Sequence, residues 1–492
     1  MKLIPRSKID LPKPDVLKHT ALCSLLLFFA AHAFCFFNLT YSSGSVMLNI
    51  SSGRSAQIAA GQYLLPIYAR IRGGISSPLF VGLLSALYLT ALNLLLVWLL
   101  RIEHPLERFM LCGTTTVNAA VLSICASSLH TSDAIFLAML AAALSCAVCL
   151  HLRLGVLPGA LMLAGALALD PSVGAFFAVL MLLTALNDLL SGSSARAFLL
   201  SILRMVFALC AGAALYLLGH ALMLHRSGID AQHTLLLWGG NLLSAYAAPI
   251  HALLSPLNAY PSLSVLIRLF FALLCVCAVI LHARAFSVKS AALLTLGLLL
   301  LPLLSGFTLL SGQEAAQITP AHCLMDILVV LLLCRVFTDS ARLRRAAGTA
   351  FAVLFLGSVV FSNQVYLKKN LEFESTLSVM TRVIARIEET PGYQPGYTPV
   401  AVIGTPEDSA LSSERRGFEH LSALDAACGN YAITQDTDMI WYTWEVLGYP
   451  LNFVSTYDLE QLRQSAEVQA LPSFPQEGCC VFVGDTLVIR LS

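Results

Sequence analysis

Long apolar segments, separated by short polar or charged stretches, follow one another through the first three quarters of the chain. About 20 apolar residues are enough for a helix to cross the hydrocarbon core of a bilayer. The pattern predicts eleven spans, near residues 19–39, 78–100, 109–129, 133–150, 155–169, 172–190, 197–223, 262–283, 290–310, 321–337 and 346–362. Asp170-Pro171 separates the short spans 155–169 and 172–190, so these two form either a tight hairpin or one kinked helix.

Basic residues distinguish the two sides of the predicted membrane segment. With the N-terminus inside, every inner loop carries Arg or Lys, whereas the outer loops carry only Arg54, Arg70, Arg72 and Arg226. The positive-inside rule therefore predicts a cytoplasmic N-terminus. Eleven spans then place the C-terminal segment outside, and merging the short pair would break the alternation. Two long outer loops result, 40–77 and 224–261, and the semi-apolar part of the second predicts one or two short interfacial helices.

Residues 363–492 show a different pattern, typical of a small water-soluble α/β domain. Pro399–Thr405 predicts a buried strand, and Glu374–Glu389 an amphipathic helix with Leu377, Met380, Ile384 and Ile387 on one face. Ser455 and Asp458 have the spacing of a capping box at the start of a helix. Cys479–Ser492 predicts a hairpin around Gly484-Asp485. The chain is accordingly divided into a membrane domain, 1–362, and an extracytoplasmic domain, 363–492.

Composition supports this division. The chain is 58% hydrophobic and 12% charged, whereas soluble domains carry about 25% charged residues. Residues 1–362 have a net charge of +10, and residues 363–492 have a net charge of −9. The acidic C-terminal domain argues against nucleic acid as a partner. Cys146 and Cys149 lie in an Ala/Leu run without a second Cys pair, so they are interpreted as packing residues, and neither a metal nor a cofactor is expected.

Several charged residues on the predicted outer side have chemistry that suits a phosphate-linked substrate. The acids are Asp133, Asp170, Asp230, Glu314 and Asp326, and the bases are Arg54, Arg70, Arg72, Arg226 and Arg268. Arginine forks bind phosphate, and a carboxylate accepts the proton of an acceptor hydroxyl. Asp133 and Asp170 also stand where helices begin or end, so a capping role is the alternative for both. Arg268 lies within a predicted span, near its outer third.

Several motifs along nearly the full length resemble a known family. They include GQYLLPIYARIRGGISSPLFVGLLSALYL (Gly61–Leu89), HTSDAIFLAMLAAAL (His130–Leu144) and, most specifically, Ser362–Gly404. In these motifs the chain is similar to the GtrII-type glucosyltransferases, bacterial multi-pass proteins of the GT-C class. The resemblance implies a GT-C-like membrane bundle in the bacterial cytoplasmic membrane. It further implies transfer of a hexose, glucose above all, from a polyprenyl-phosphate donor to an envelope glycan such as O-antigen or a cell-wall polymer.

The first outer loop departs from the family pattern. GT-C enzymes commonly carry a catalytic acid in this loop, but here SSGSVMLNISSGRS contains none. Three alternatives remain open: the chemistry has moved to Asp133 or Asp170, activity has been lost, or the protein binds or moves a lipid-linked sugar without transferring it. The leading hypothesis is a glycosyltransferase with Asp133 as the first candidate base and Asp170 as the second. Arg54, Arg72 and Arg268 are then the candidates for binding the donor phosphate.

Overall fold

Proline residues begin several of the long helices. Pro14, Pro78, Pro105 and Pro261 each occupy the first helical position, where the proline ring has a suitable φ and its missing N–H leaves no hydrogen bond unmade. The structure is a computed structural model. It describes residues 12–38, 54–152, 154–229, 242–254, 257–307, 318–409, 411–413, 415–424 and 429–492.

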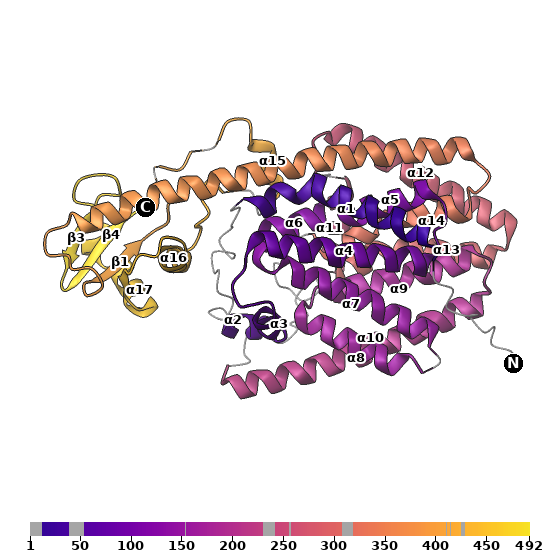
Figure 1. Ribbon diagram of the computed structural model, residues 1–492, viewed down its shortest axis with the longest axis horizontal. Coiled ribbons are helices and arrows are strands. Elements are labelled where there is room, and N and C mark those ends of the chain that lie inside the picture. Colours follow the sequence, from indigo (N-terminus) through magenta and orange to yellow (C-terminus); the bar gives the residue numbers. More distant parts are fainter. Residues whose placement is uncertain are drawn as a thin grey trace.

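A helical bundle makes up most of the described chain, and a small α/β domain extends from one of its ends (Figure 1). We call this the domain end of the bundle and the opposite one the far end. The helices of the bundle are α1 (Pro14–Phe37), α4 (Pro78–Leu100), α5 (Pro105–Thr116), α6 (Ala119–Ser127), α7 (Ser132–His151), α8 (Val156–Leu169), α9 (Val173–Leu190), α10 (Ala195–Ser227), α11 (Leu242–Leu254), α12 (Pro261–Ala285), α13 (Val288–Ser305), α14 (Ile327–Arg335) and the first part of α15 (Ala341–Glu388).

Hydrogen bonds between distant parts of the chain bring the ends of several helices together. At the far end, Arg335 donates to the Asn187 side-chain oxygen and to the Leu100 carbonyl, both at 2.9 Å. At the domain end, the Leu64 N–H donates to the Ala168 carbonyl at 3.0 Å. Helix α9 lies at the centre of the bundle, where nearly all of its side chains are buried.

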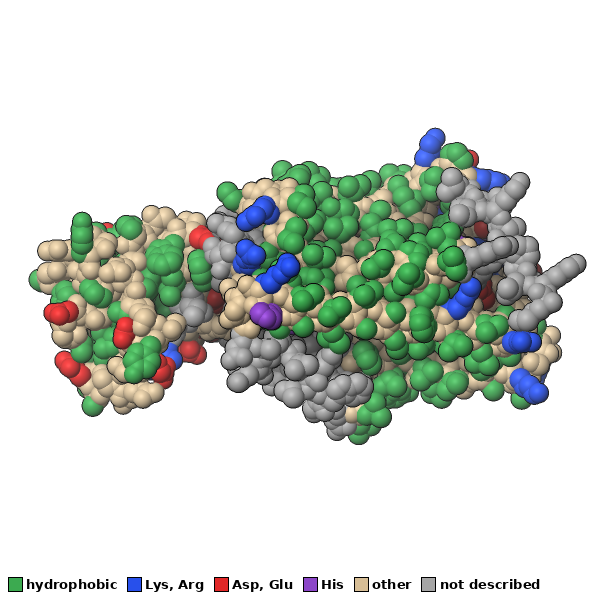
Figure 2. Space-filling view, turned by 90° about the horizontal axis from the view of Figure 1, so that it is seen from below, with side chains coloured by type: hydrophobic (Ala, Val, Ile, Leu, Met, Phe, Trp, Pro, Cys, Tyr) green, Lys and Arg blue, Asp and Glu red, His purple; other side chains and the backbone are tan. Residues whose placement is uncertain are grey.

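The outer surface of the bundle suits a lipid environment. Figure 2 shows a broad belt of hydrophobic side chains with Lys and Arg side chains gathered toward both ends of it. Nine helical stretches of the described chain are long and apolar enough to cross a membrane. Helix α8, with 14 residues, would extend only about 21 Å, which is less than the hydrocarbon thickness of about 30 Å. The structure therefore has the make-up of a multi-pass membrane protein.

The prediction of a mainly helical bundle with a C-terminal α/β part is confirmed, and each of the eleven expected spans falls on helical structure over most of its described length. Residues 155–169 and 172–190 form two separate helices, α8 and α9, rather than one kinked helix. The stretch expected at 321–337 comprises a short 3₁₀ helix, η6 (Pro320–Leu324), and α14. The number of actual membrane crossings and the GT-C architecture stay predictions.

Helix α15 connects the bundle to the C-terminal domain without interruption. It is 48 residues long, and Figure 1 shows it running along the bundle and out into the α/β domain. The division placed between residues 362 and 363 thus falls inside one helix. No Pro or Gly occurs between Gly357 and Pro391, so nothing in this stretch opposes helix continuation, although its apolar character ends.

The C-terminal domain is a three-layer structure built on a four-stranded sheet of order β2-β1-β4-β3. Its strands are β1 (Pro399–Ile403), β2 (Asn452–Phe453), β3 (Cys480–Val483) and β4 (Thr486–Arg490), of which β1 is parallel to β2 and β4. Strands β3 and β4 form the expected antiparallel hairpin, in which Gly484 has a φ of +62°. The helices are the end of α15, α16 (Asp436–Trp441), α17 (Thr456–Gln464) and α18 (Ala466–Gln469).

Alternate residues of β1 pack on opposite faces of the sheet, as strand geometry requires. Val400 and Val402 belong to the core that includes the α15 residues, whereas Ala401 and Ile403 pack with residues of α17 and α18. The Ser455 hydroxyl accepts from the Asp458 N–H at 3.2 Å at the start of α17, as its spacing predicts. Of the four residues expected on one face of this part of α15, Met380, Ile384 and Ile387 are buried, whereas Leu377 lies at the edge of the buried face and is 41% exposed.

Candidate functional site at the domain end of the bundle

A described part of the first long loop, residues 54–77, packs across the domain ends of α7, α8 and α10. It contains two short helices, α2 (Arg54–Ala59) and α3 (Leu65–Ile71). The His220 side chain of α10 forms a hydrogen bond with the Ile58 carbonyl at 2.8 Å. Arg54, a candidate for phosphate binding, is the first residue of α2 and is exposed. Residues 41–53 lie outside the described residues.

Asp133 and Arg72 form a buried ion pair, with 0% and 2% of their side chains exposed. Asp133 lies in the first turn of α7, and its other carboxylate oxygen accepts from the Tyr68 hydroxyl at 2.7 Å. Arg72 also donates to the Ser76 hydroxyl at 2.7 Å and to the His130 carbonyl at 2.9 Å. Buried charges are stable only when paired and hydrogen-bonded, so these contacts fix the loop on α7.

Asp170 occupies the turn between α8 and α9 and is 6% exposed. One carboxylate oxygen accepts from the N–H and from the hydroxyl of Ser172, the former at 2.8 Å. The other oxygen lies 3.4 Å from the Gln62 side-chain nitrogen. These bonds to residues two positions along the chain are typical of an Asx turn, so Asp170 ends one helix and also contacts the first loop.

Three aromatic rings stack beside this turn. The ring centroids of Tyr63 and Tyr216 lie 5.9 Å apart, and His220 stacks with both at 6.2 and 6.0 Å. Tyr63 belongs to the first loop, whereas the other two lie one turn apart on α10. The stack therefore joins the loop to α10, as the Arg72–Asp133 pair joins it to α7.

A second Arg–Asp pair, between Arg268 and Asp326, lines a small cavity. Arg268 follows the first residue of α12 by seven positions, about 10 Å along the helix axis. Asp326 stands immediately before α14. The two side chains are 21% and 20% exposed, which makes them far more accessible than Arg72 and Asp133. The Arg268 Nε has no hydrogen-bond partner in the described structure.

The cavity beside Arg268 and Asp326 has a volume of about 50 Å³, enough for a few water molecules. Its polar lining includes Thr114, Asn118, Asn258 and Ser358. Asn118 lies at the break between α5 and α6, where its side chain accepts from the Ala120 and Val121 N–H groups at 2.8 and 3.1 Å. Irregular backbone at membrane depth is tolerated where it lines a cavity, so these breaks suit a polar site within the bundle.

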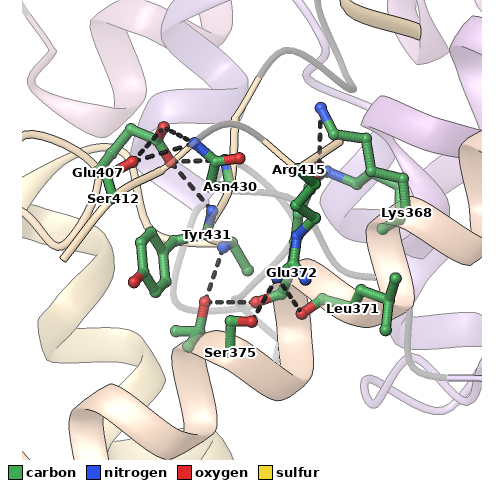
Figure 3. Close-up of polar contacts among 12 residues, drawn as sticks. Lys368, Leu371, Glu372, Ser375, Glu407, Ser412, Arg415, Asn430 and Tyr431 are labelled. Atoms are coloured by element: carbon green, nitrogen blue, oxygen red, sulfur yellow. Dashed lines mark hydrogen bonds and ion pairs between the residues drawn. The ribbon is translucent and has the colours of Figure 1, made fainter. Parts of the chain in front are cut away.

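A third polar cluster fixes the C-terminal domain on α15 just beyond the apolar part of the helix (Figure 3). Lys368 and Lys369 pair with Glu372 at 3.7 and 3.0 Å, and all three side chains are buried. Arg415 donates to the Leu371 carbonyl at 3.1 Å and to the Ser375 hydroxyl. These contacts give the cluster a clear structural role at the junction of the two domains.

Glu407 holds loop residues beside this cluster. Its carboxylate accepts from the Asn430 and Tyr431 N–H groups at 2.7 and 3.0 Å, and from the Asn430 amide at 3.1 Å (Figure 3). The adjacent Ala432 N–H donates to the Thr376 hydroxyl of α15 at 2.8 Å. The segment around Ala432, together with Glu407, is thereby bound to α15 by hydrogen bonds as well as by apolar packing.

The structure brings some of the predicted site residues into contact with one another and leaves others apart. Asp133 lies with Arg72, and Asp170 contacts the first loop. Arg268 lies with Asp326, an outer acid without an assigned role in the sequence. Tyr68 was not predicted as a contact of Asp133, although its position four residues before Arg72 places both on one face of a helix. Asp230 and Glu314 lie outside the described residues.

Comparisons with known proteins add no assignment. No family model, no curated protein and no solved structure matches this chain.

Proposed function

We propose that this protein is a membrane glycosyltransferase that moves a hexose, with glucose as the first candidate, from a polyprenyl-phosphate donor to an envelope glycan. The observation that carries the proposal is the partly accessible Arg268–Asp326 pair in a polar cavity of the bundle. The proposed location is the bacterial cytoplasmic membrane, with the N-terminus in the cytoplasm and the C-terminal domain outside. The similarity of several motifs to GtrII-type enzymes supports the same activity.

Arg268 and Asp326 have the chemistry that this reaction requires. An incoming donor phosphate competes with Asp326 for the Arg268 guanidinium, which prefers bidentate contacts with phosphate. Asp326, released from the pair, accepts the proton of the acceptor hydroxyl. The hydroxyl oxygen bonds to the anomeric carbon while the bond from that carbon to the phosphate oxygen breaks. The polyprenyl phosphate leaves with the electron pair, and Arg268 stabilises its charge.

The proposal requires the cavity to widen when the donor binds. The present volume is about 50 Å³, whereas small-molecule sites commonly measure about 300–1,000 Å³. Asp133, the first candidate from the sequence, is fully withdrawn from solvent and held by Arg72 and Tyr68. The proposal therefore assigns the proton acceptor to Asp326, and it assigns Asp133 and Asp170 to positioning the first loop.

Donor turnover by the reconstituted protein tests the proposal. Polyprenyl-phosphate glucose and envelope glycan from the host would be supplied, and loss of the lipid-linked sugar would be followed. Asp326→Asn should lower turnover by at least about 100-fold, the scale of general-base catalysis. The matched control is Asp339→Asn, which changes an exposed acid at the far end and should leave turnover unchanged. Full activity in Asp326→Asn would exclude this residue as the base.

A non-catalytic role is the second candidate, as a binder or transport partner of a lipid-linked sugar. Asp133 and Asp326 are both paired with arginine, and Asp170 is engaged by Ser172 and Gln62. In addition, the sequence between Tyr41 and Gln62 contains no acid. Saturable binding of polyprenyl-phosphate glucose without turnover would favour this role. Turnover that is lost in Asp326→Asn would exclude it.

A further inference from the structure

The C-terminal domain carries a groove with a volume of about 420 Å³, lined by Gly396, Trp444, Gly448, Tyr449, Pro450, Leu451 and Asn452. All of these residues belong to the described chain. Most residues of the groove come directly after α16 in the sequence. In Figure 1, α16 lies between the sheet and the domain end of the bundle. Its volume falls within the range of small-molecule sites, about 300–1,000 Å³. It is thus far larger than the cavity beside Arg268 and Asp326.

Trp444 is an exposed aromatic side chain held in a fixed orientation. It is 46% exposed, so part of its ring is available for stacking against a ligand. Its indole N–H donates to the Leu451 carbonyl at 3.1 Å. The ring also makes edge-to-face contacts with Trp441 and Phe453, with centroids 6.0 and 6.2 Å apart. Little conformational entropy is therefore lost when a ligand stacks on it.

The rest of the groove combines open backbone with hydrogen-bonding groups. Gly396 and Gly448 have φ values of +75° and +64°, and no atom lies within 4 Å of a Cβ placed on either. Tyr449 donates from its hydroxyl to Glu388, so its ring is also fixed. Asn452 is exposed and donates to the Tyr397 carbonyl at 3.1 Å. Aromatic rings beside amide and carboxylate groups suit a ligand with both C–H faces and hydroxyl groups.

The surrounding charge selects among such ligands. Glu388 and Glu389 are exposed near this part of the domain, and residues 363–492 carry a net charge of −9. An anionic ligand would be repelled by this field. A neutral sugar would not, because its hydroxyl groups exchange hydrogen bonds with amide and carboxylate groups while its ring stacks on an indole.

We propose that this groove binds neutral saccharide units, with Trp444 as the stacking platform and Asn452 as a hydrogen-bonding partner. The inference deepens the proposed function, on which it rests for the role of the groove as a holding site for the glycan acceptor. The binding itself needs neither the donor nor the bundle cavity. A failure of the groove and a failure of the transferase are consequently distinguishable.

The test is saccharide binding to the full-length protein in lipid nanodiscs, without donor. The probes are neutral trisaccharides of glucose, galactose, mannose or N-acetylglucosamine. Their binding is measured by saturation-transfer NMR and titration calorimetry. A trisaccharide of galacturonic acid serves as the charged comparison. We expect saturable binding of at least one neutral probe and at least tenfold weaker binding of it in Trp444→Ala. Binding of the galacturonic acid probe should be weaker than that of the neutral one.

Two further variants protect the test against a folding defect. Asn452→Ala shortens an exposed side chain and should weaken binding several-fold while leaving the unfolding temperature nearly unchanged. The matched control is Tyr457→Ala, which removes a 71% exposed aromatic residue of α17 outside the groove, and it should bind normally. Absence of saturable binding by every neutral probe, or undiminished binding in Trp444→Ala, would overturn the proposal. Absence of donor turnover in a protein that still binds saccharide would instead count against the proposed transferase activity alone.

Discussion

Tyr216 occupies the space in which Gly61 would carry a side chain. A Cβ atom placed on Gly61 would lie 2.2 Å from the Tyr216 hydroxyl oxygen. A reciprocal contact exists nearby, because a Cβ on Gly219 would lie 2.5 Å from the Tyr63 hydroxyl oxygen. The first loop and α10 thus each place a tyrosine against a glycine of the other. This arrangement explains how two stacked rings approach the backbone closely at the domain end.

The second contact leads to a test of how tightly the loop is held. Gly219→Ala should lower the unfolding free energy by about 1–3 kcal/mol, the usual cost of overpacking. Tyr63→Phe removes the hydroxyl that the new methyl group meets, so the double variant should recover much of this loss. Thermal unfolding of the four proteins in detergent measures the coupling. Equal effects of Gly219→Ala with and without the Tyr63 hydroxyl would show that the contact is not the cause.

The buried pair of Arg72 and Asp133 should behave as a structural ion pair. Asp133→Ala leaves the guanidinium buried without its carboxylate, so the unfolding free energy should fall by roughly 3–5 kcal/mol. The double variant Arg72→Met/Asp133→Leu removes both charges and should recover most of that stability. Thermal unfolding in detergent again provides the measurement.

The control for this pair is Arg70→Met, which changes an exposed arginine in the last turn of α3, two residues before Arg72, and should have little effect. If Asp133→Ala kept full stability while donor turnover disappeared, the structural role would be refuted. Asp133 would then return as the proton acceptor in place of Asp326.

Helices and strands followed from the sequence because their signals are local. Apolar runs marked the spans, and Asp170-Pro171 and Gly484-Asp485 marked two turns. The continuity of α15 did not follow, because loss of apolar character was interpreted as a boundary although no helix-breaking residue occurs there. The contacts of the candidate site depend on packing between segments far apart. Arg72 and Asp133 are 61 residues apart, and Arg268 and Asp326 are 58 residues apart.

The predicted orientation can be tested with single added cysteines. Tyr457→Cys places a thiol at a 71% exposed position of the C-terminal domain, and Ser191→Cys places one at an exposed position of the far end. By the positive-inside rule, a membrane-impermeant maleimide should label the first in intact cells and the second only after permeabilisation. Labelling is measured as the increase over the parent chain. The opposite pattern would place the C-terminal domain in the cytoplasm.

Cys480 should react more slowly with iodoacetamide than an unfolded thiol does at the same pH. Burial raises the pKa of this thiol, against a smaller lowering by the Thr390 hydroxyl, which donates to the sulfur at 3.4 Å. The thiolate is the reactive form, so the rate should rise with pH over a range above the ordinary pKa of about 8.5. Mass spectrometry of a Cys479→Ala background would follow the reaction in folded and urea-unfolded protein.

Thr390→Val provides the matched comparison for Cys480. Removing the hydroxyl should raise the pKa of the thiol further and move the rate profile to still higher pH. Coincident profiles of the folded and unfolded chains would contradict the expected shift. A profile with a lower rate but an unchanged midpoint would show steric protection instead.

The uninterrupted helix α15 has a geometric consequence for the whole molecule. An α-helix advances about 1.5 Å and turns about 100° for each residue. The number of residues between the bundle and the sheet therefore determines the angle at which the C-terminal domain stands around the helix axis. Its 48 residues span about 72 Å as one continuous helix. One residue added near Ser362 would hardly lengthen it, yet it would turn the Trp444 groove by about a quarter of a turn around the axis of α15. Distance along the chain is thereby converted into angular register between the two domains.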